Sequence, residues 1–398
     1  MKLEQLFQNT IFLLGAGASM DAKCLSSSKM LQQLKENIKL LDKPDEKGIY
    51  NKYQSYKKEF HEIYEFVLAS INYQQTLKNS LIHNNSYLNI EDFVMVLRQL
   101  KDKEFIIPYP LVGNWNDKII KWELKNEKNN IFEEFKNFII NQLVNSWTRY
   151  NSQNAQALLK PIRELLYSAE EFKINVFSLN YDLIFEENFN TEKKRLLENG
   201  FTPRKINDKK VYLWSDDVFE HRDSAVKINL YKLHGSLNWE YDNENEVIGI
   251  KKNIFDGEEP LIIFGSSYKM LSFDPFLFIL SEFRKKLQNA QIFVVIGYSF
   301  HDKYINNLLI QQLSQPTSKK MMIVDPDLKM SPKEFTEKLE NIQNNKSIND
   351  VINFKKLNPA KLEILKSTAK EFFKDYFSNK AKKLGDLLQE AEKEDRIF

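Results

Sequence analysis

Short, mostly apolar runs alternate along the chain with segments in which apolar residues recur every three or four positions. A run without strict polar alternation is typical of a strand buried on both faces, whereas three- and four-residue spacing predicts amphipathic helices. The strand-like runs in this alternation are residues 10–14, 174–178, 228–233, 291–296 and 320–324. We therefore expect an α/β fold with a Rossmann-like parallel sheet covered by helices on both faces.

Weaker patterns predict further strands and helices in the C-terminal half of the chain. Two further runs, 210–214 and 261–264, have strand character, and helices are expected at 276–288 and 302–313. The tail, 359–398, has charged amphipathic spacing and is expected to be helical.

A long helical block separates the first predicted strand from the second, and no internal repeat of 20 to 50 residues is visible in it. The segments with helical spacing in this block are 53–79, 90–100, 115–147 and 153–169. We interpret the block as an insertion, which divides the chain into three regions. These are a Rossmann-like domain formed by 1–30 and 172–330, an α-helical insertion at 31–171, and a helical C-terminal region at 331–398.

Composition and charge narrow the possible functions. Of 398 residues, 57 are Lys or Arg and 55 are Asp or Glu, so the net charge of +2 argues against a constitutive polyanion binder. The single cysteine, Cys24, excludes a disulfide framework and any zinc site built on several cysteines. With five histidines, an imidazole metal cluster is not expected either, so we predict no metal.

The amino terminus shows no targeting signal, because residues 1–9 are polar and the apolar run at 11–14 is too short for a signal peptide. No stretch approaches the ~18 consecutive apolar residues that a membrane span requires. We therefore expect a cytoplasmic protein.

Small and polar residues gather just after the predicted parallel strands. Open α/β sheets bind ligands at the carboxyl ends of their strands, so these clusters mark the expected site. They are Gly15-Ala-Gly-Ala-Ser-Met-Asp21, Ser178-Leu-Asn-Tyr-Asp182, Leu233-His-Gly-Ser236, Gly297-Tyr-Ser-Phe-His-Asp302 and Asp325.

The first cluster allows backbone to approach a pyrophosphate at Gly15 and Gly17, although Gly-x-Gly after a strand is also an ordinary tight turn. A dehydrogenase fingerprint would have a third glycine where Met20 stands and an acidic residue about 20 positions later. Neither is present, which disfavours a hydride-transferring oxidoreductase.

The other clusters each have a structural alternative. Asn180 and Asp182 suit helix capping as well as ligand binding, and a lone His234 is more often structural than a general base. Asp302 is as suited to capping the next helix as to binding, and Asp325 to starting the Asp-Pro turn as to holding a ribose. Gly297 and Ser299 suit phosphate or ribose contacts, so the shared order of the clusters carries more weight than any one of them.

That order resembles the bacterial sirtuin-like family, and the Tyr-Ser-Phe-x-Asp form of the fourth cluster resembles its anti-phage defence branch, which consumes NAD. The resemblance covers residues 8–20 and 172–327. It implies NAD as substrate and general-base catalysis by His234, with Asn180 at the nicotinamide ribose and the attacking water. It further implies a nucleotide cradle of Gly15, Ala16, Gly17, Ser19, Asp21, Asp182, Gly297, Ser299 and Asp325.

Protein-deacylating sirtuins carry a four-cysteine zinc module, which a chain with only Cys24 cannot form. The resemblance therefore implies an NAD+ glycohydrolase that releases nicotinamide and ADP-ribose more than a deacylase. Because free NAD depletion would harm the host, we expect gating by assembly or by a partner. A homo-oligomer and a HerA-type ATPase partner are implied by family and length.

Two other classes stay open. One is a non-catalytic module that binds NAD or ADP-ribose and signals through partners, and the other, less favoured, is the deacylase. Direct nucleic-acid binding is a further alternative, but the basic stretches 118–136 and 380–383 have acidic residues among or close after them and are interpreted as solvated helix faces.

Overall fold

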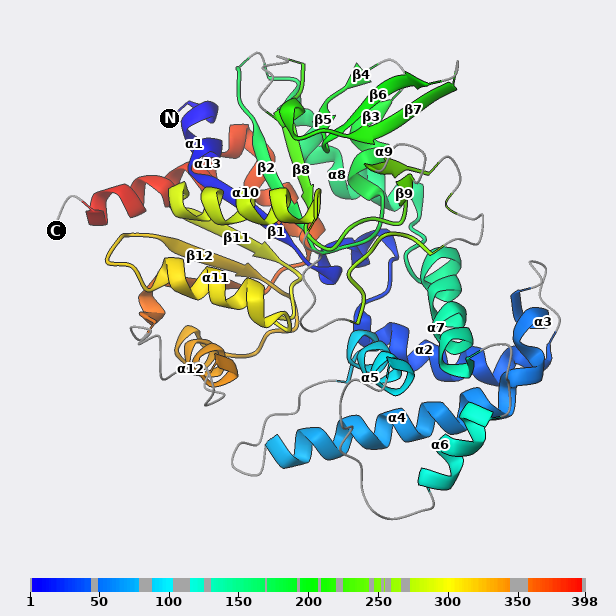
Figure 1. Ribbon diagram of the computed structural model, residues 1–398. Coiled ribbons are helices and arrows are strands. Elements are labelled where there is room, and N and C mark those ends of the chain that lie inside the picture. The colour runs from blue at the N-terminus through cyan, green and yellow to red at the C-terminus, as the bar shows by residue number, and fades with distance from the viewer. Residues whose placement is uncertain are drawn as a thin grey trace.

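A seven-stranded parallel sheet forms the centre of the molecule, with the strand order β13-β12-β11-β1-β2-β8-β5 (Figure 1). Its strands are β1 (Thr10–Leu14), β2 (Ile174–Ser178), β5 (Leu197–Glu198), β8 (Ile228–Lys232), β11 (Ile292–Ile296), β12 (Lys320–Val324) and β13 (Leu362–Leu365). The computed structural model describes residues 2–43, 49–78, 88–102, 115–124, 130–168, 170–191, 194–206, 209–219, 225–242, 247–251, 254, 259–265, 273–343 and 357–395.

Successive residues of β1 enter different cores, as the twofold alternation of a strand requires. Phe12 and Leu14 pack with α1 (Leu3–Gln8), α8 (Ser152–Leu166) and α13 (Ala369–Asp395). Ile11 and Leu13 pack with α10 (Phe276–Asn289), α11 (Lys303–Leu313) and α12 (Pro332–Gln343) on the opposite face. The sheet is therefore buried between two helical layers, which confirms the expected α/β Rossmann-like class with its helical tail.

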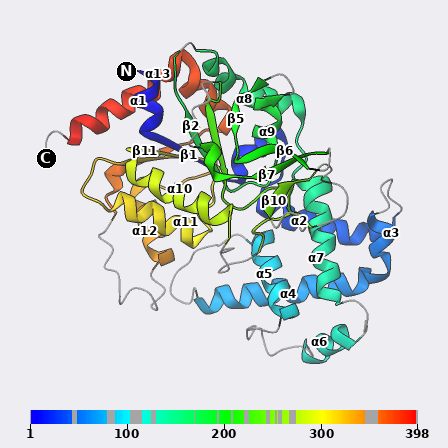
Figure 2. The same ribbon diagram turned by 45° about the horizontal axis from the view of Figure 1, so that its top comes forward.

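The helical block has a core of its own. Its helices are α2 (Ser27–Lys39), α3 (Ile49–Tyr53), α4 (Lys57–Lys78), α5 (Ile90–Asp102), α6 (Trp115–Leu124) and α7 (Ile131–Gln142), followed by a π turn at Leu143–Trp147. Stacked aromatic rings fill this core, with the centroids of Phe60 and Phe135 4.4 Å apart. Figures 1 and 2 show the block at the end toward which β1 runs, with α5 between α4 and the sheet. By contrast, α8, also within 31–171, packs against the sheet.

A smaller antiparallel sheet lies beside the edge of the main sheet. Its order is β6-β7-β10-β9, and the predicted strand at 210–214 belongs to it rather than to the parallel sheet. Its strands are β6 (Phe201–Ile206), β7 (Lys209–Trp214), β9 (Trp239–Asp242) and β10 (Val247–Ile250). A short helix, α9 (Ile184–Phe189), leads to the two-stranded ribbon β3 (Asn190–Thr191) and β4 (Lys194–Arg195).

Two sequence-based predictions are wrong at the level of single elements. Residues 261–264 form no strand, and only an isolated bridge joins Ile262 to Gly235. The predicted helix from 359 onward begins only at Ala369, because Leu362–Leu365 adds to the sheet as β13. A capping box sets that start: the Thr368 amide donates to the Glu371 carboxylate (2.9 Å), and the Glu371 amide donates to the Thr368 hydroxyl (3.2 Å).

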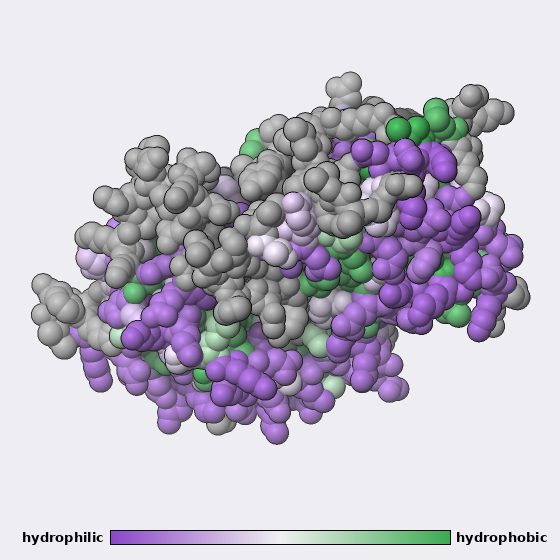
Figure 3. Space-filling model, turned by 90° about the horizontal axis from the view of Figure 1, so that it is seen from below, coloured by the Kyte–Doolittle hydropathy of each residue, from purple (hydrophilic) through white to green (hydrophobic). Residues whose placement is uncertain are grey.

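The surface agrees with this packing. Figure 3 views the molecule from the side of the helical block, and among the residues it colours by hydropathy most are hydrophilic, with hydrophobic side chains in scattered places. The apolar faces of these helices are therefore turned inward. Among the helices of the described residues, none combines the length and the apolar composition needed to cross a membrane.

Candidate functional site

The glycine loop after β1 packs backbone to backbone against the loop after β11. The Gly15 amide donates to Ile296 O (2.9 Å) and the Gly17 amide donates to Gly297 O (2.8 Å). A Cβ atom at Gly15 would lie 2.6 Å from Gly297 O, and Gly297 itself has a φ of +60°. Only residues without side chains allow this approach. Ala16, Gly17, Ser19 and Asp21 lie on the 3₁₀ helix that follows, Ala16–Ala22.

A directed chain of hydrogen bonds connects the glycine loop to the loop after β2. The Asn180 side-chain amide donates both to Gly15 O (2.9 Å) and to the Ser19 hydroxyl (3.0 Å). The Ser19 hydroxyl in turn donates to the Asp182 carboxylate at 2.7 Å. Because both amide hydrogens of Asn180 are used, its carboxamide oxygen is the group left to accept a hydrogen bond from a ligand or water.

A buried lysine, Lys232, holds the loop after β2 in place. Lys232 is 2% exposed, and its ammonium donates to the main-chain oxygen of Asp182 and lies 3.6 Å from the Glu186 carboxylate. Burial raises the pKa of Glu186 despite the opposing charge of Lys232. These side chains line a cavity of ≈10 Å³, which is about the volume of one water site. Sequence reasoning missed Lys232, although a charge inside a buried strand was a visible signal.

His234 follows β8 and reaches a carboxylate that follows β11. Its Nε2 lies 3.0 Å from Asp302 Oδ2, and the His234 side chain is 13% exposed. The other oxygen of Asp302 caps α11 by accepting from the amides of Tyr304 (2.8 Å) and Ile305 (3.1 Å). Burial works to raise the pKa of Asp302, but the hydrogen bond and charge of His234 outweigh it, so the pKa is lowered. Asp302 thus caps a helix and also holds an imidazole.

The strand register brings these loops to one edge. Ser178 of β2 pairs with Lys232 of β8, so Asn180 and His234 each stand two residues beyond the same rung. In the sheet, β2 and β1 separate β8 from β11, a span of about 14 Å. The contact between His234 and Asp302 therefore crosses over the carboxyl ends of β1 and β2, where the Asn180 chain lies.

Three of the residues expected to form the nucleotide cradle either make other hydrogen bonds or are exposed. Asp21 accepts the Lys370 amide at 2.9 Å and so caps the start of α13. Asp325 accepts the amide of Asp327 at 2.8 Å, within its own turn. Ser299 is exposed on the loop after β11. The remaining predicted residues, Gly15, Ala16, Gly17, Ser19, Asn180, Asp182, His234 and Gly297, lie on the loops that meet at this edge.

The insertion contributes polar groups to the same edge, which sequence reasoning did not foresee. Asp92 of α5 lies 2.8 Å from Nε2 of His301, and this contact raises the pKa of His301. Burial raises the pKa of the neighbouring Glu91. The only sequence signal was the acidic start of the helix at Asn89, whose side chain accepts the amides of Glu91 (2.9 Å) and Asp92 (3.0 Å).

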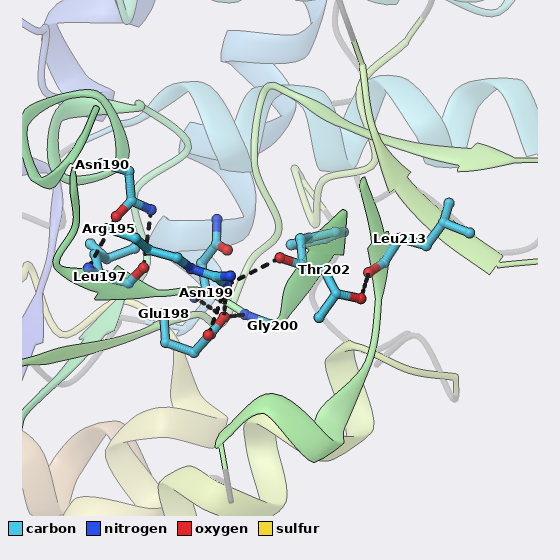
Figure 4. Close-up of polar contacts among 9 residues, drawn as sticks. Asn190, Arg195, Leu197, Glu198, Asn199, Gly200, Thr202 and Leu213 are labelled. Atoms are coloured by element: carbon cyan, nitrogen blue, oxygen red, sulfur yellow. Dashed lines mark hydrogen bonds and ion pairs between the residues drawn. The ribbon is translucent and has the colours of Figure 1, made fainter. Parts of the chain in front are cut away.

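A larger cavity of ≈380 Å³ opens at the amino ends of β2 and β8, away from these loops. One of its acidic groups, Glu198, has its hydrogen bonds satisfied: the Arg195 guanidinium donates to both carboxylate oxygens at 2.7 Å (Figure 4). The amides of Asn199 and Gly200 also donate to Glu198, each at 3.0 Å. This arrangement anchors the edge strand β5 and gives Glu198 a structural role.

Comparison with known families assigns the region that carries most of these loops. Residues 174–348 match the family described as the SIR2-like domain. The match supports a sirtuin-like family. It fits NAD-related activity in general, and no curated protein matches the chain.

The SIR2-like match includes Asn180, Asp182, His234 and Asp302, whereas the glycine loop and the helical insertion precede it in the chain. The parallel sheet is nevertheless completed by β1, which lies outside the match and pairs with both β2 and β11. Within the residues the structure describes, no group of three or more His, Cys, Asp or Glu side chains is arranged to hold a metal ion.

Proposed function

We propose that this protein is an NAD+ glycohydrolase, which cleaves NAD+ into nicotinamide and ADP-ribose. The observation that carries the proposal is the paired position of Asn180 and His234, each two residues beyond one rung of neighbouring strands. Both stand at the carboxyl edge of a parallel sheet beside the glycine loop, where α/β folds bind nucleotides.

The chemistry needs few groups, because nicotinamide leaves NAD+ as a neutral molecule from a cationic centre. The bond from ribose C1′ to the nicotinamide nitrogen breaks with its electron pair going to the ring, and water oxygen bonds to C1′. The carboxamide oxygen of Asn180 holds that water or the neighbouring ribose hydroxyl. His234 accepts the proton that water loses, and Asp302 stabilises the resulting imidazolium at 3.0 Å.

The rest of the nucleotide is assigned to the neighbouring loops. The loop from Gly15 to Ser19 is assigned to the pyrophosphate, and the close packing against Gly297 requires that Gly15 and Gly17 carry no side chain. Asp182 orients the carboxamide or ribose from its fixed place below Ser19. Ser299 and Asp325 are assigned to the adenosine half of NAD. Asp21 is assigned to the nucleotide-binding loop as a further member beside Gly15 to Ser19.

The cavity beside Asn180 has about the volume of one water and cannot by itself hold a dinucleotide. Because uncontrolled NAD cleavage would harm the host, we propose that the activity is gated by assembly or by a partner. We propose that the protein depletes NAD in anti-phage defence from a cytoplasmic homo-oligomer, with a HerA-type ATPase as the candidate partner.

Turnover of a fluorescent etheno-NAD analogue tests the proposal, with and without candidate partners. Asn180→Ala and His234→Ala are each expected to lower turnover by about 10²- to 10⁴-fold, the usual contribution of one positioned acid-base group. His61→Ala, on an exposed position of α4, is the matched control and is expected to keep full activity. Binding without nicotinamide release in every preparation would instead support the non-catalytic NAD or ADP-ribose module.

A further inference from the structure

The insertion meets the candidate site through one side chain of α5 and one of the loop after β11. Asp92 Oδ1 lies 2.8 Å from Nε2 of His301, the residue directly before Asp302. Asp302 in turn lies 3.0 Å from His234. Two adjacent residues of this loop therefore make contacts in two directions, His301 with the insertion and Asp302 with the proposed general base.

The start of α5 holds the Asp92 carboxylate in place. Ile90 and Phe93, on either side of it, are fully buried in the core of the insertion. The Asn89 side chain caps the helix by accepting the Asp92 amide at 3.0 Å, and it donates to Asp92 Oδ2 at 2.8 Å. One carboxylate oxygen is thus fixed by the cap, and the other is directed at His301.

The loop that carries His301 depends on contacts with its surroundings, because Phe300 has a left-handed conformation. Its φ is +57°, which is unfavourable for a side chain as bulky as phenylalanine. From α11, the Asn306 side-chain amide donates to Phe300 O at 2.8 Å. From the insertion, the contact with Asp92 holds the side chain of the next residue. The strained segment is therefore held from two separate elements.

The charges around His301 favour its protonated form. The hydrogen bond with Asp92 raises the pKa of His301 and outweighs burial, which works to lower it. Glu91 of the same helix and Asp302 of the same loop act in the same direction as Asp92. Below the raised pKa the contact is an ion pair, and above it the imidazole is neutral and this attraction is lost.

We propose that Asp92 is a positioning residue of the NAD-cleaving site, which holds the loop after β11 through His301 and so keeps the Asp302 carboxylate against His234. This inference rests on the proposed function. It connects the insertion to the chemistry, because a displacement of α5, which lies between α4 and the sheet (Figures 1 and 2), would separate Asp92 from His301.

A double-mutant cycle on NAD turnover tests the inference. Asp92→Ala and His301→Ala are each expected to lower kcat by about 10-fold with KM within about threefold, because a catalytic group is misplaced. The double variant should also lose about 10-fold rather than the ~100-fold product, since both changes remove the same contact. Asp102→Ala, at the exposed far end of α5, is the matched control and is expected to change neither constant.

The pH dependence gives a readout that a merely structural role would not move. As pH rises through the raised pKa of His301, the ion pair is lost. The ratio of kcat between the unmodified protein and Asp92→Ala should therefore fall on that side. Titration of His234 occurs in both proteins and does not by itself change the ratio. A ratio that is the same at every pH would contradict the inference.

Proton NMR with ¹³C-labelled histidine reads the contact without any NAD. The His301 resonance is identified by its loss in His301→Ala, and Asp92→Ala is expected to lower the pKa of His301 toward its ordinary value of about 6.5. An unchanged pKa, unchanged kcat in the single variants, or additive losses in the double variant overturns the inference alone. A protein that never releases nicotinamide, although the pKa of His301 shifts as expected, overturns the proposed function and with it the catalytic role of Asp92.

Discussion

At the scale of single residues, the His234–Asp302 pair is the contact with the clearest chemical consequence. A carboxylate at 3.0 Å from an imidazole fixes the orientation of the ring. The same carboxylate caps α11, so the position of the pair is tied to a helix rather than to a loose loop.

Replacing this carboxylate separates its two roles. Asp302→Asn is expected to leave thermal stability nearly unchanged, because asparagine caps a helix about as well as aspartate. NAD turnover should fall by about 10²-fold or more, since a neutral amide cannot stabilise the imidazolium. Differential scanning fluorimetry and a turnover assay on the same preparation check both. Full activity in this variant would contradict the role of Asp302.

Cys24 gives a second prediction at this scale. Its thiol is buried and lies 3.4 Å from Thr148 O, and burial strongly raises its pKa. The reactive thiolate is therefore scarce, and the native protein is expected to react very slowly with Ellman's reagent. After unfolding in guanidinium, one thiol per chain should react. Rapid modification of the native protein would contradict the burial of Cys24.

Sequence reasoning located the polar clusters that stand on a single loop, but it did not find contacts between segments far apart in the chain. The polar clusters at the strand ends were visible because each is continuous in sequence. The contact of Asp302 with His234, 68 positions apart, was not. Asp92 looked like part of an ordinary acidic first turn, since only the packing of α5 brings it to His301.

At the scale of elements, the C-terminal helix is a structural part of the sheet domain. Phe377 of α13 is 2% exposed, and its ring centroid lies 5.4 Å from that of Phe12 in β1. Phe373 lines the cavity beside Asn180, so α13 also packs against the candidate site.

Removal of the Phe377 side chain should therefore lower the stability of the protein. Phe377→Ala is expected to lower the free energy of unfolding by about 3–5 kcal/mol, because it leaves a cavity in the main core. Lys374→Ala, on the exposed side of the same helix, should change it by less than about 0.5 kcal/mol. Urea unfolding monitored by circular dichroism measures both. Equal stability of the two variants would show that α13 is not packed as described.

Elements with strong signals were predicted well. The five long strands are buried on both faces, so their apolar runs stand out, and β1, β2, β8, β11 and β12 all confirm them. The edge strand β13 was missed because it is short, half-exposed and continuous with a strongly helical tail. Residues 261–264 are apolar because they pack between two cores and not because they pair in a sheet. Ile262 and Phe264 belong to the core of the insertion, whereas Leu261 and Ile263 pack against the core beneath α10 and α11.

At the scale of the whole molecule, the cores on the two faces of the sheet and the core of the insertion border one candidate site. The sheet supplies Asn180 and His234, and the insertion supplies Asp92, which contacts His301, together with the apolar core that holds Tyr181. The parallel sheet could be predicted from sequence, but the docking of the insertion against it could not, because no local pattern encodes which helix faces which loop. This arrangement connects the position of the insertion to the proposed chemistry.

The most direct test is the product balance measured by proton NMR when the protein is incubated with NAD+, alone and with its candidate ATPase partner. The account predicts that nicotinamide and ADP-ribose accumulate in equal amounts, and that both form about 10²- to 10⁴-fold more slowly with Asn180→Ala or His234→Ala. NAD+ that remains intact in every preparation, or cleavage at the unmodified rate in both variants, would contradict it.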